Sequence, residues 1–572
     1  MRTRLRPAVV FAAVVSALPL LAAIAAVARG PWTPVADDAL IALRTGDVFT
    51  SAPPLVGVYS RFRWNHPGPA LFLTLAPFQA VLGTRGLVLG AGLVGSAALA
   101  FSMWLLWRRG GAPLVVLMGC ALVLLAVGSG GDLVDPWNPY VSVVPLVALM
   151  AGAWSVLEGD RWILPVVVGI ASWLVQVHLG YVLLAVVLAG VAVVARLARR
   201  PWRDARAELA VTAGVLLVAW LPPIVQQLTS DRGNLSRIVD TPARNVVGLH
   251  RALGVAAQQI ALPRGWLLGD DRTEGILRWV STAPVWWLLL PLVAWLLAGI
   301  AVWRRTADRD LARTALRYQA LAGVLVPTAV VSVSRIQGLP FPYLVRWQWV
   351  VAMFVWTSVA WSALVATGLV VRRDGAVTLR TGDRTVAVVA GVVATILICV
   401  GVTAAVRTPL PDEDRARSVD AVVGRVVDAI AGDAAVRMVA EGDYRDEYRN
   451  GIGAALERRG IDVQYPVEAE NRVGARRARP GGVDAVLVVA TGEWLAGRLD
   501  TGQAPVVVHD PLTPAERTEL DRLERRSRRE IAAVVDGRTP ADPLSGADKA
   551  RQRALTDKGP RFGVFREVVA VP

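Results

Sequence analysis

Long apolar blocks recur along most of the chain, and they constrain its fold more than any other feature. Over the 572 residues, 54% are hydrophobic and 19% charged, against roughly 25% charged in soluble proteins. This composition excludes a soluble enzyme, and it also excludes disordered, collagen-like and disulfide-built chains. Many of the blocks approach the ~20 residues that a membrane-crossing helix needs. They cover residues 8–28, 87–107, 112–129, 139–157, 162–178, 180–195, 209–229, 283–303, 315–333, 346–371 and 385–406.

Arginine clusters between these runs indicate their orientation, because cytoplasmic loops carry an excess of basic residues. The clusters are Arg108-Arg109 and the stretches 196–206, 304–317 and 372–384. All of them fall on the cytoplasmic side if a further short run at 68–82 does not cross. We therefore predict a polytopic α-helical plasma-membrane protein of about 11 spans with a cytoplasmic N-terminus. A cleaved signal peptide is the alternative for the first run.

This orientation gives two long external loops. The first covers residues 29–86 and contains the non-crossing helix 68–82, and the second covers residues 230–282. The net charge of +15 is spread between apolar runs rather than gathered on one surface, so we expect membrane lipid as a partner and no nucleic acid. Cys120 and Cys399 lie inside apolar runs and indicate neither a disulfide framework nor a metal site.

The composition changes at Arg407, where long apolar runs end. Helical patterns at 418–430, 446–459 and 513–536 alternate with strand-like runs at 435–440, 461–465, 485–490 and 505–509. This alternation predicts a soluble α/β domain over 407–572, next to a transmembrane domain over 1–406. The parity of the spans places the α/β domain outside the cell.

Two adjacent acids, Asp37 and Asp38, follow the first apolar run. Carboxylates at this position can act as a general base, as metal ligands or as a helix cap. Capping of a helix over 39–45 is the plain interpretation because Asp is favoured at helix N-termini. A catalytic role for Asp37 or Asp38 is the functional interpretation.

The same loop continues with an unusually dense polar and aromatic stretch. Arginine has a planar fork suited to phosphate, and Trp and Tyr suit a membrane interface or stacking on a sugar ring. An interfacial belt is the alternative to a binding site. The candidate binding residues in this stretch are Tyr59, Arg61, Arg63, Trp64, Asn65 and His66.

Further candidates lie at other external positions. Asp135, Trp137 and Asn138 occur in a proline-rich segment that also reads as a turn. Gln176 and His178 lie at an external helix end, where a lone histidine is commonly a buried, hydrogen-bonded residue. Arg346 belongs to an aromatic-basic segment before the run 346–371.

The acidic pair and the sequence His66-Pro67-Gly68-Pro69 before a short apolar helix resemble the GT-C superfamily of glycosyltransferases. The chain also resembles actinobacterial membrane proteins with the patterns Tyr-Ser-Arg-x-x-Trp-x-His-Pro-Gly-Pro and Asp-Pro-Trp-Asn-Pro, matched here at 59–69 and 135–139. The resemblance implies inverting transfer of a sugar from a polyprenyl-phosphate donor to an external glycan, lipid or protein of the cell envelope, with Asp37 or Asp38 as the base. The related enzymes bind phosphate with Lys, so that role would pass here to Arg61, Arg63 or Arg346.

Two other functions stay open at this point. One is transport or flipping of lipid-linked intermediates, although such proteins place charges within their spans. The other is non-catalytic envelope assembly through the α/β domain. Asp37 and Asp38 could also hold a divalent cation with Asp135, but no metal-specific spacing supports it, and the absence of nucleotide-binding motifs argues against nucleotide use.

Overall fold

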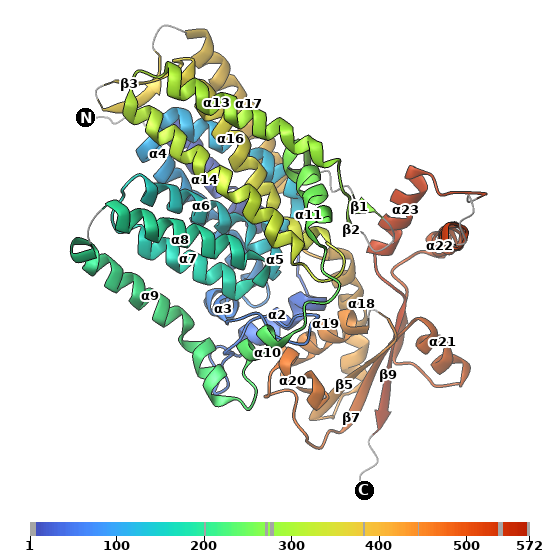
Figure 1. The fold of residues 1–572 in the computed structure, drawn as a ribbon. Coiled ribbons are helices and arrows are strands. Elements are labelled where there is room, and N and C mark those ends of the chain that lie inside the picture. Colours follow the sequence, from blue (N-terminus) through green and yellow to red (C-terminus); the bar gives the residue numbers. More distant parts are fainter. Residues whose placement is uncertain are drawn as a thin grey trace. The chain divides into compact units, whose positions relative to one another are not determined.

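The computed structural model in Figure 1 describes residues 7–199, 202–262, 264–268, 273–274, 279–373, 375–380, 384–443, 445–535 and 541–568. The chain divides into two compact units. The first, called the membrane unit below, comprises Met1–Gly30 and Pro54–Leu410. The second, called the α/β unit, comprises Pro31–Pro53 and Pro411–Pro572. The basic residues 1–6, which predict a cytoplasmic N-terminus, lie outside the described residues.

Helices make up most of the membrane unit. Nine helical segments of the described ranges are long and apolar enough to cross a bilayer, as expected of a polytopic membrane protein. The helices are α1 (Pro7–Ala28), α3 (Ala70–Leu82), α4 (Arg85–Ser129), α5 (Asn138–Val141), α6 (Val143–Leu157), α7 (Leu164–Val177), α8 (Val182–Arg199), α9 (Trp202–Thr229), α10 (Asn234–Asp240), α11 (Leu249–Ala256), α12 (Arg264–Leu268), α13 (Leu289–Arg305), α14 (Arg309–Ser334), α15 (Pro342–Val345), α16 (Gln348–Ala366) and α17 (Arg384–Arg407).

The long helix α4 reverses direction at Gly111, whose φ of +61° favours glycine. Before this point Gly92 packs on Ala23 and Gly95 on Pro19, so α4 runs toward the start of α1. After Gly111, Gly119 packs on Phe11. Val123 and Leu18 both contact Gly401, so these two residues lie at the same level. The two halves of α4 therefore run antiparallel and account for the two predicted runs 87–107 and 112–129.

Each predicted apolar run coincides with a helix, but the number of crossings stays a prediction. α7 has 14 residues and α3 has 13; at 1.5 Å per residue they reach about 20 Å, less than the ~30 Å hydrocarbon core. A helix forms at the predicted short run 68–82, and its length suits the non-crossing interpretation.

The arginine clusters predicted to share one side of the membrane meet at one end of the membrane unit. Arg108 and Arg109 both pair with Asp160, at 2.8 and 2.5 Å. Arg317 pairs with Glu158 at 3.1 Å, and Arg372 of β3 (Val370–Arg373) lies 3.6 Å from Asp308. β3 forms a hairpin with β4 (Ala376–Leu379). Which side of the membrane this end faces stays a prediction.

A five-stranded mixed sheet forms the centre of the α/β unit, in the order β6-β5-β7-β9-β8. β5 (Ala435–Glu441), β6 (Asp462–Gln464) and β7 (Ala485–Thr491) are parallel, whereas β9 (Phe562–Val568) is antiparallel to β7 and to β8 (Val507–His509). Strands form at the four predicted strand positions, and β9 is additional. The helices are α18 (Glu413–Ala429), α19 (Arg445–Glu457), α20 (Glu470–Val473), α21 (Gly492–Asp500), α22 (Pro514–Val535) and α23 (Gly546–Asp557).

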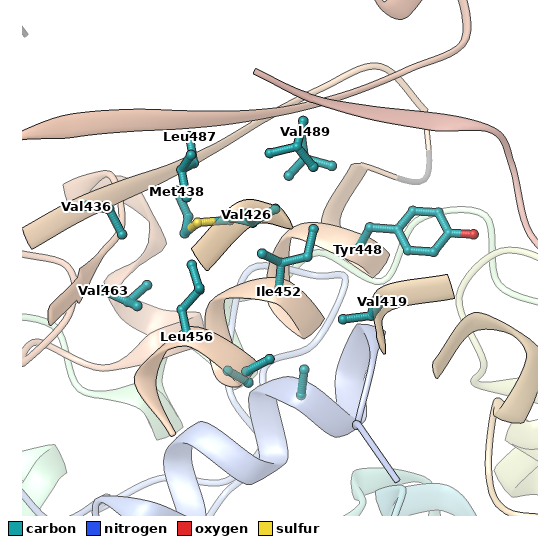
Figure 2. Close-up of a cluster of buried hydrophobic side chains, with 14 of the residues drawn as sticks. Val419, Val426, Val436, Met438, Tyr448, Ile452, Leu456, Val463, Leu487 and Val489 are labelled. Carbon is teal, nitrogen blue, oxygen red and sulfur yellow. The ribbon is translucent and has the colours of Figure 1, made fainter. Parts of the chain in front are cut away.

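Helix α2 (Ala36–Gly46) belongs to the α/β unit, although it lies near the start of the chain. Its buried face carries Val35, Ala39, Leu40 and Leu43, which join the cluster of apolar side chains shown in Figure 2. α2 packs against α19, where Gly451 leaves room for Val35. The predicted boundary near residue 407 lies close to the observed one after Leu410, but residues 31–53 join the α/β unit because they bury their apolar face in its core.

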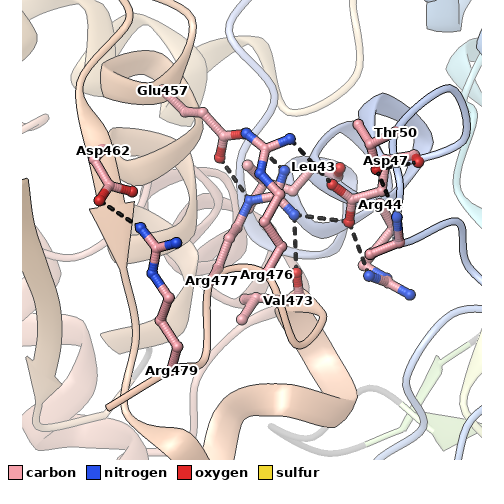
Figure 3. Close-up of polar contacts among 11 residues, drawn as sticks. Leu43, Arg44, Asp47, Thr50, Glu457, Asp462, Val473, Arg476, Arg477 and Arg479 are labelled. Atoms are coloured by element: carbon pink, nitrogen blue, oxygen red, sulfur yellow. Dashed lines mark hydrogen bonds and ion pairs between the residues drawn. The ribbon is translucent and has the colours of Figure 1, made fainter. Parts of the chain in front are cut away.

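The end of α2 is also held by buried charges (Figure 3). Asp47 is fully buried and accepts from Arg44 and Arg477, each at 2.8 Å. Arg477 also donates to both carboxylate oxygens of Glu457, at 2.6 and 2.7 Å, and to the Leu43 carbonyl. Apolar packing and ion pairing thus attach the same helix to the α/β unit.

Candidate functional site

A small hairpin in the membrane unit presents the dense motif of the first loop. Gly57 donates to the His66 carbonyl, His66 donates to the Val58 carbonyl, and Ser60 donates to the Trp64 carbonyl. Tyr59 and Asn65 form a bridge across the two arms. Arg63 lies at the tip with a φ of +66° and an exposed side chain. The six predicted binding residues Tyr59, Arg61, Arg63, Trp64, Asn65 and His66 therefore lie on one compact element.

Asn234 of α10 attaches this hairpin to the end of α9. Its side-chain oxygen accepts from the Asn65 amide at 2.9 Å, and its side-chain nitrogen donates to the Asn65 carbonyl at 2.8 Å. The Asn65 side chain itself donates to the Gly57 carbonyl. Gln226 in turn accepts from the Asn234 amide. Asn234 was not among the predicted site residues, since 169 positions separate it from Asn65.

Gly68 and Gln176 fit together closely beside the hairpin. A Cβ at Gly68 would lie 2.1 Å from the Gln176 side-chain oxygen, so a larger residue there would have to displace the Gln176 side chain. The Gln176 amide donates to the Ala219 carbonyl of α9 at 2.8 Å. This carbonyl has no helical N–H partner because Pro223, four residues later, lacks the hydrogen. Gln176 is therefore a structural link between α7 and α9, next to His66-Pro67-Gly68-Pro69.

The rings of His66 and His178 are in contact, with centroids 4.8 Å apart and a tilt of 34° between the ring planes. Nδ1 of His66 accepts from the Leu179 amide and Nδ1 of His178 from the Gly180 amide, each at 3.1 Å. Each neutral ring must then carry its hydrogen on Nε2. Burial lowers the pKa of His178 to about 4, and burial together with His178 lowers the pKa of His66 well below its usual value. Both rings are thus neutral Nε2–H donors near pH 7.

The proline-rich segment after α4 forms a turn beside the histidines. Asp135 accepts from the Trp137 amide at 2.8 Å, the hydrogen bond expected of a turn-forming Asp. The Asn138 amide donates to the Val177 carbonyl, next to His178. The Tyr181 hydroxyl donates to the Pro139 carbonyl at 2.9 Å. This hydrogen bond fits the turn interpretation of Asp135, and Asn138 connects this segment to the end of α7.

Arg346 is buried and its charge is compensated. Its Nε lies 3.0 Å from a carboxylate oxygen of Asp132. Its guanidinium also lies over the ring of Trp349, 4.0 Å from the centroid. Charge pairing and ring stacking are what a structural arginine needs when it leaves water. Arg346 therefore fits a phosphate ligand less well than an arginine that reaches solvent.

Aromatic rings connect these segments into one surface. Trp137 contacts Tyr140 and Tyr343, and Tyr343 stacks on Phe341. Arg61 places its guanidinium between Phe341 and Phe62 and donates to the Gln337 carbonyl at 2.9 Å. Trp64 packs between Phe62 and His66. Three motifs that the sequence predicts to be external, far apart along the chain, thus meet at one end of the membrane unit. We call this surface the aromatic site.

Asp37 and Asp38 lie in the other unit, in the first turn of α2. The N-cap position is occupied by Val35, and Asp37 and Asp38 are the second and third residues of the helix. Asp38 is buried. Burial raises the pKa of Glu447, and the nearby negative charge of Asp37 adds to that rise. Among the described residues no cluster of three or more His, Cys, Asp or Glu side chains could hold a metal ion.

Comparisons with known proteins give matches of structure alone. No protein-family model and no curated protein matches the chain. The crystal structure of ArnT from Cupriavidus metallidurans in the apo state is similar over 85% of this chain and 94% of its own, with 13% identity and a TM-score of 0.45. The archaeal oligosaccharyltransferase AglB from Archaeoglobus fulgidus was solved in complex with an inhibitory peptide and a dolichol-phosphate. It is similar over 84% of this chain and 69% of its own, with 11% identity and a TM-score of 0.33.

Proposed function

We propose that the chain is a membrane glycosyltransferase of the GT-C type, which transfers a sugar from a polyprenyl phosphate to a cell-envelope acceptor on the external face. The observation that carries the proposal is the aromatic site. The two motifs of the sequence resemblance, at 59–69 and 135–139, lie on elements joined by hydrogen bonds and ring contacts. Packing alone would not require so many Tyr, Trp, Arg and His side chains at one end of a helical bundle.

Arg63 is the best candidate for the phosphate of the donor. Arg346 is paired with Asp132, and Arg61 is held by the Gln337 carbonyl and two rings. Arg63 instead lies exposed at the hairpin tip, where a guanidinium can bind phosphate in two-pronged geometry. The Nε2–H groups of His66 and His178 add neutral donors for sugar or phosphate oxygens.

Trp64 supplies a further polar group in the same place. Its side chain is 8% exposed, and its indole N–H has no hydrogen-bond partner among the described residues. Buried donors normally have acceptors. A ligand hydroxyl at the edge of the indole ring would accept this hydrogen.

Asp37 or Asp38 is the base of the proposed reaction. The carboxylate takes the proton of the acceptor hydroxyl, whose oxygen forms a bond to the anomeric carbon. The bond from that carbon to the phosphate oxygen breaks, and the polyprenyl phosphate leaves with its electron pair. A single displacement of this kind inverts the anomeric configuration. The proposal requires that α2 bring its carboxylates to the donor.

The test uses the purified full-length protein and a radiolabelled mixture of polyprenyl-phosphate sugars, with release of the polyprenyl phosphate and the configuration of the new bond as readouts. Asp37→Asn or Asp38→Asn should reduce transfer about 10²- to 10⁴-fold, the usual contribution of a general base. Arg63→Gln should raise the KM for the donor. Asp231→Asn, which changes an exposed acid after α9, is the matched control and should leave transfer unchanged.

Other outcomes would favour the rival functions. Intact transfer in Asp37→Asn, Asp38→Asn and the double variant would exclude the proposed base. A wild-type protein that moves the lipid-linked sugar across a vesicle membrane without releasing polyprenyl phosphate would be a transporter. A protein with neither activity that binds an envelope protein through the α/β unit would be an assembly factor.

A further inference from the structure

A cavity of about 1260 Å³ lies at the arginine-rich end of the membrane unit, away from the aromatic site. Its walls come from the first turns of α1, the reversal of α4, the β3–β4 hairpin and α17. Apolar side chains such as Phe11, Trp107 and Ile398 line it together with Arg108, Arg109 and Arg372. This volume exceeds that of a single bound water many times over and is large enough for a ligand.

The backbone around this cavity is specifically shaped. A Cβ at Gly111 would lie 2.1 Å from the Val377 carbonyl oxygen, so the reversal of α4 and the hairpin meet backbone to backbone. On the opposite wall, a Cβ at Gly391 of α17 would meet no atom within 4 Å. The small residues Ala390, Gly391 and Ala394 keep this wall open. Close backbone packing at Gly111 and open space at Gly391 together define the cavity.

Charge distinguishes this cavity from an ordinary packing gap. Among the described residues, its lining contains three arginines and no acidic residue. Arg108 and Arg109 share the single carboxylate of Asp160, which leaves one positive charge uncompensated within this group. Arg372 lies 3.6 Å from Asp308 and 4.0 Å from Asp310, both too far for a tight hydrogen bond, so its guanidinium keeps donors for a ligand. A cavity with guanidinium groups at one margin and apolar walls suits an amphipathic anion.

We propose that this cavity binds a membrane phospholipid with an anionic headgroup, its phosphate against Arg108, Arg109 and Arg372 and part of an acyl chain between α1, α4 and α17. Much of α17 is exposed apolar surface, including Val389, Val393 and Ile396, so lipid has access to this side. Basic pockets between membrane helices are known to favour anionic headgroups. The proposal does not depend on the glycosyltransferase function.

Native mass spectrometry of the full-length protein in detergent tests it, with phosphatidylglycerol and phosphatidylcholine of the same acyl chains as probes. We expect phosphatidylglycerol to bind more tightly. Arg372→Gln should weaken it about fivefold, as expected for one basic residue at an anionic headgroup. Gly391→Leu, which fills the cavity without changing its charge, should also displace the lipid.

Two matched variants separate the cavity from general effects of charge and size. Arg305→Gln removes an exposed charge of α13 that does not line the cavity, and Gly190→Leu enlarges a glycine of α8 that also has open space around it. Both should bind phosphatidylglycerol as the wild type does. Equal binding of the two lipids, or equal losses in the cavity variants and these controls, would overturn the proposal. Displacement by inorganic phosphate at equal concentration would also overturn it, because the ligand would then be a soluble phosphate compound.

Discussion

The side chain of Asn234 brackets the backbone of Asn65, accepting from its amide at 2.9 Å and donating to its carbonyl at 2.8 Å. Both residues are buried, so this contact replaces the water that the peptide group of Asn65 would otherwise bind. Asn234→Ala leaves that amide and carbonyl without these partners. We expect a loss of about 1–3 kcal/mol in the free energy of unfolding, the usual cost of an unsatisfied buried group. Thermal unfolding of the purified protein in detergent measures it.

Val239→Ala is the matched control for this prediction. It truncates a side chain of the same helix α10 that is 81% exposed, so the unfolding temperature should change little. Equal stability of Asn234→Ala and Val239→Ala would show that the bracket contributes nothing to folding. If the hairpin holds the donor, Asn234→Ala should also lower transfer more than Val239→Ala does at a temperature where both are folded.

Gly68→Ala should displace the side chain of Gln176, because the added Cβ would lie 2.1 Å from its oxygen. The displaced amide would release the Ala219 carbonyl, and the free energy of unfolding should fall by about 1–3 kcal/mol. The double variant Gly68→Ala/Gln176→Ala should lose less than the sum of the single variants, because each affects the same contact. Additive losses would contradict this coupling. Gly214→Ala, in open space on α9, should be nearly neutral.

Stability should fall as the pH drops below about 6.5, in part because of the two buried histidines. The pKa of His178 is lowered to about 4 and that of His66 is lowered well below its usual value, both chiefly by burial. In the unfolded chain both titrate near 6.5. Their stabilising contribution is therefore complete above pH 6.5, and it is lost as the pH falls toward 4, where the unfolded state binds more protons.

Each histidine contributes a slope of up to about 1.4 kcal/mol per pH unit in this window. The variant His66→Gln/His178→Gln should therefore show a shallower fall in the free energy of unfolding between pH 6.5 and 4.5 than the wild type. Carboxylates contribute equally to both proteins and cancel in the comparison. Identical slopes would mean that the rings become protonated without leaving their positions. His250→Gln, at the start of α11, is a control with the same loss of an imidazole.

The sequence predicts the helices of the membrane unit well because lipid forces each crossing segment to satisfy its own backbone hydrogen bonds. The information is then local, and the apolar runs can be read without knowing their neighbours. The hairpin at 57–66 follows the same logic, since its hydrogen bonds join residues within ten positions of one another. Its dense composition identified six of the candidate residues.

Long-range contacts were the limit of the sequence analysis. α2 is amphipathic and short, and its partner α19 lies about 400 residues later, so nothing local assigns it to the α/β unit. Asn234 falls within the predicted loop 230–282, and only the fold shows that it brackets Asn65. β9 carries the charged residues Arg566 and Glu567 near its end. It pairs antiparallel with β7, whereas β5, β6 and β7 are parallel to one another. Its place depends on neighbours that the pattern of residues does not reveal.

The buried Asp47 gives a test of how α2 is attached to the α/β unit. It pairs with Arg477 and Arg44 at 2.8 Å without any exposure to water (Figure 3). Asp47→Ala removes one partner of a buried pair, which typically costs about 3–5 kcal/mol. Because Arg477 remains bonded to Glu457, we expect the loss to concentrate at α2. Hydrogen–deuterium exchange of peptides covering 36–47 in the full-length protein should then rise strongly.

Asp462→Ala separates this effect from the loss of any ion pair in the α/β unit. Asp462 pairs with Arg479 at 2.5 Å, but both side chains are nearly half exposed, and pairs of this kind contribute little. Exchange of residues 36–47 should therefore stay as in the wild type. Unchanged exchange in Asp47→Ala would mean that the apolar face of Val35, Ala39 and Leu43 holds α2 without the charges. In that case Leu43→Ala, which leaves a cavity in the core of Figure 2, should release the helix instead.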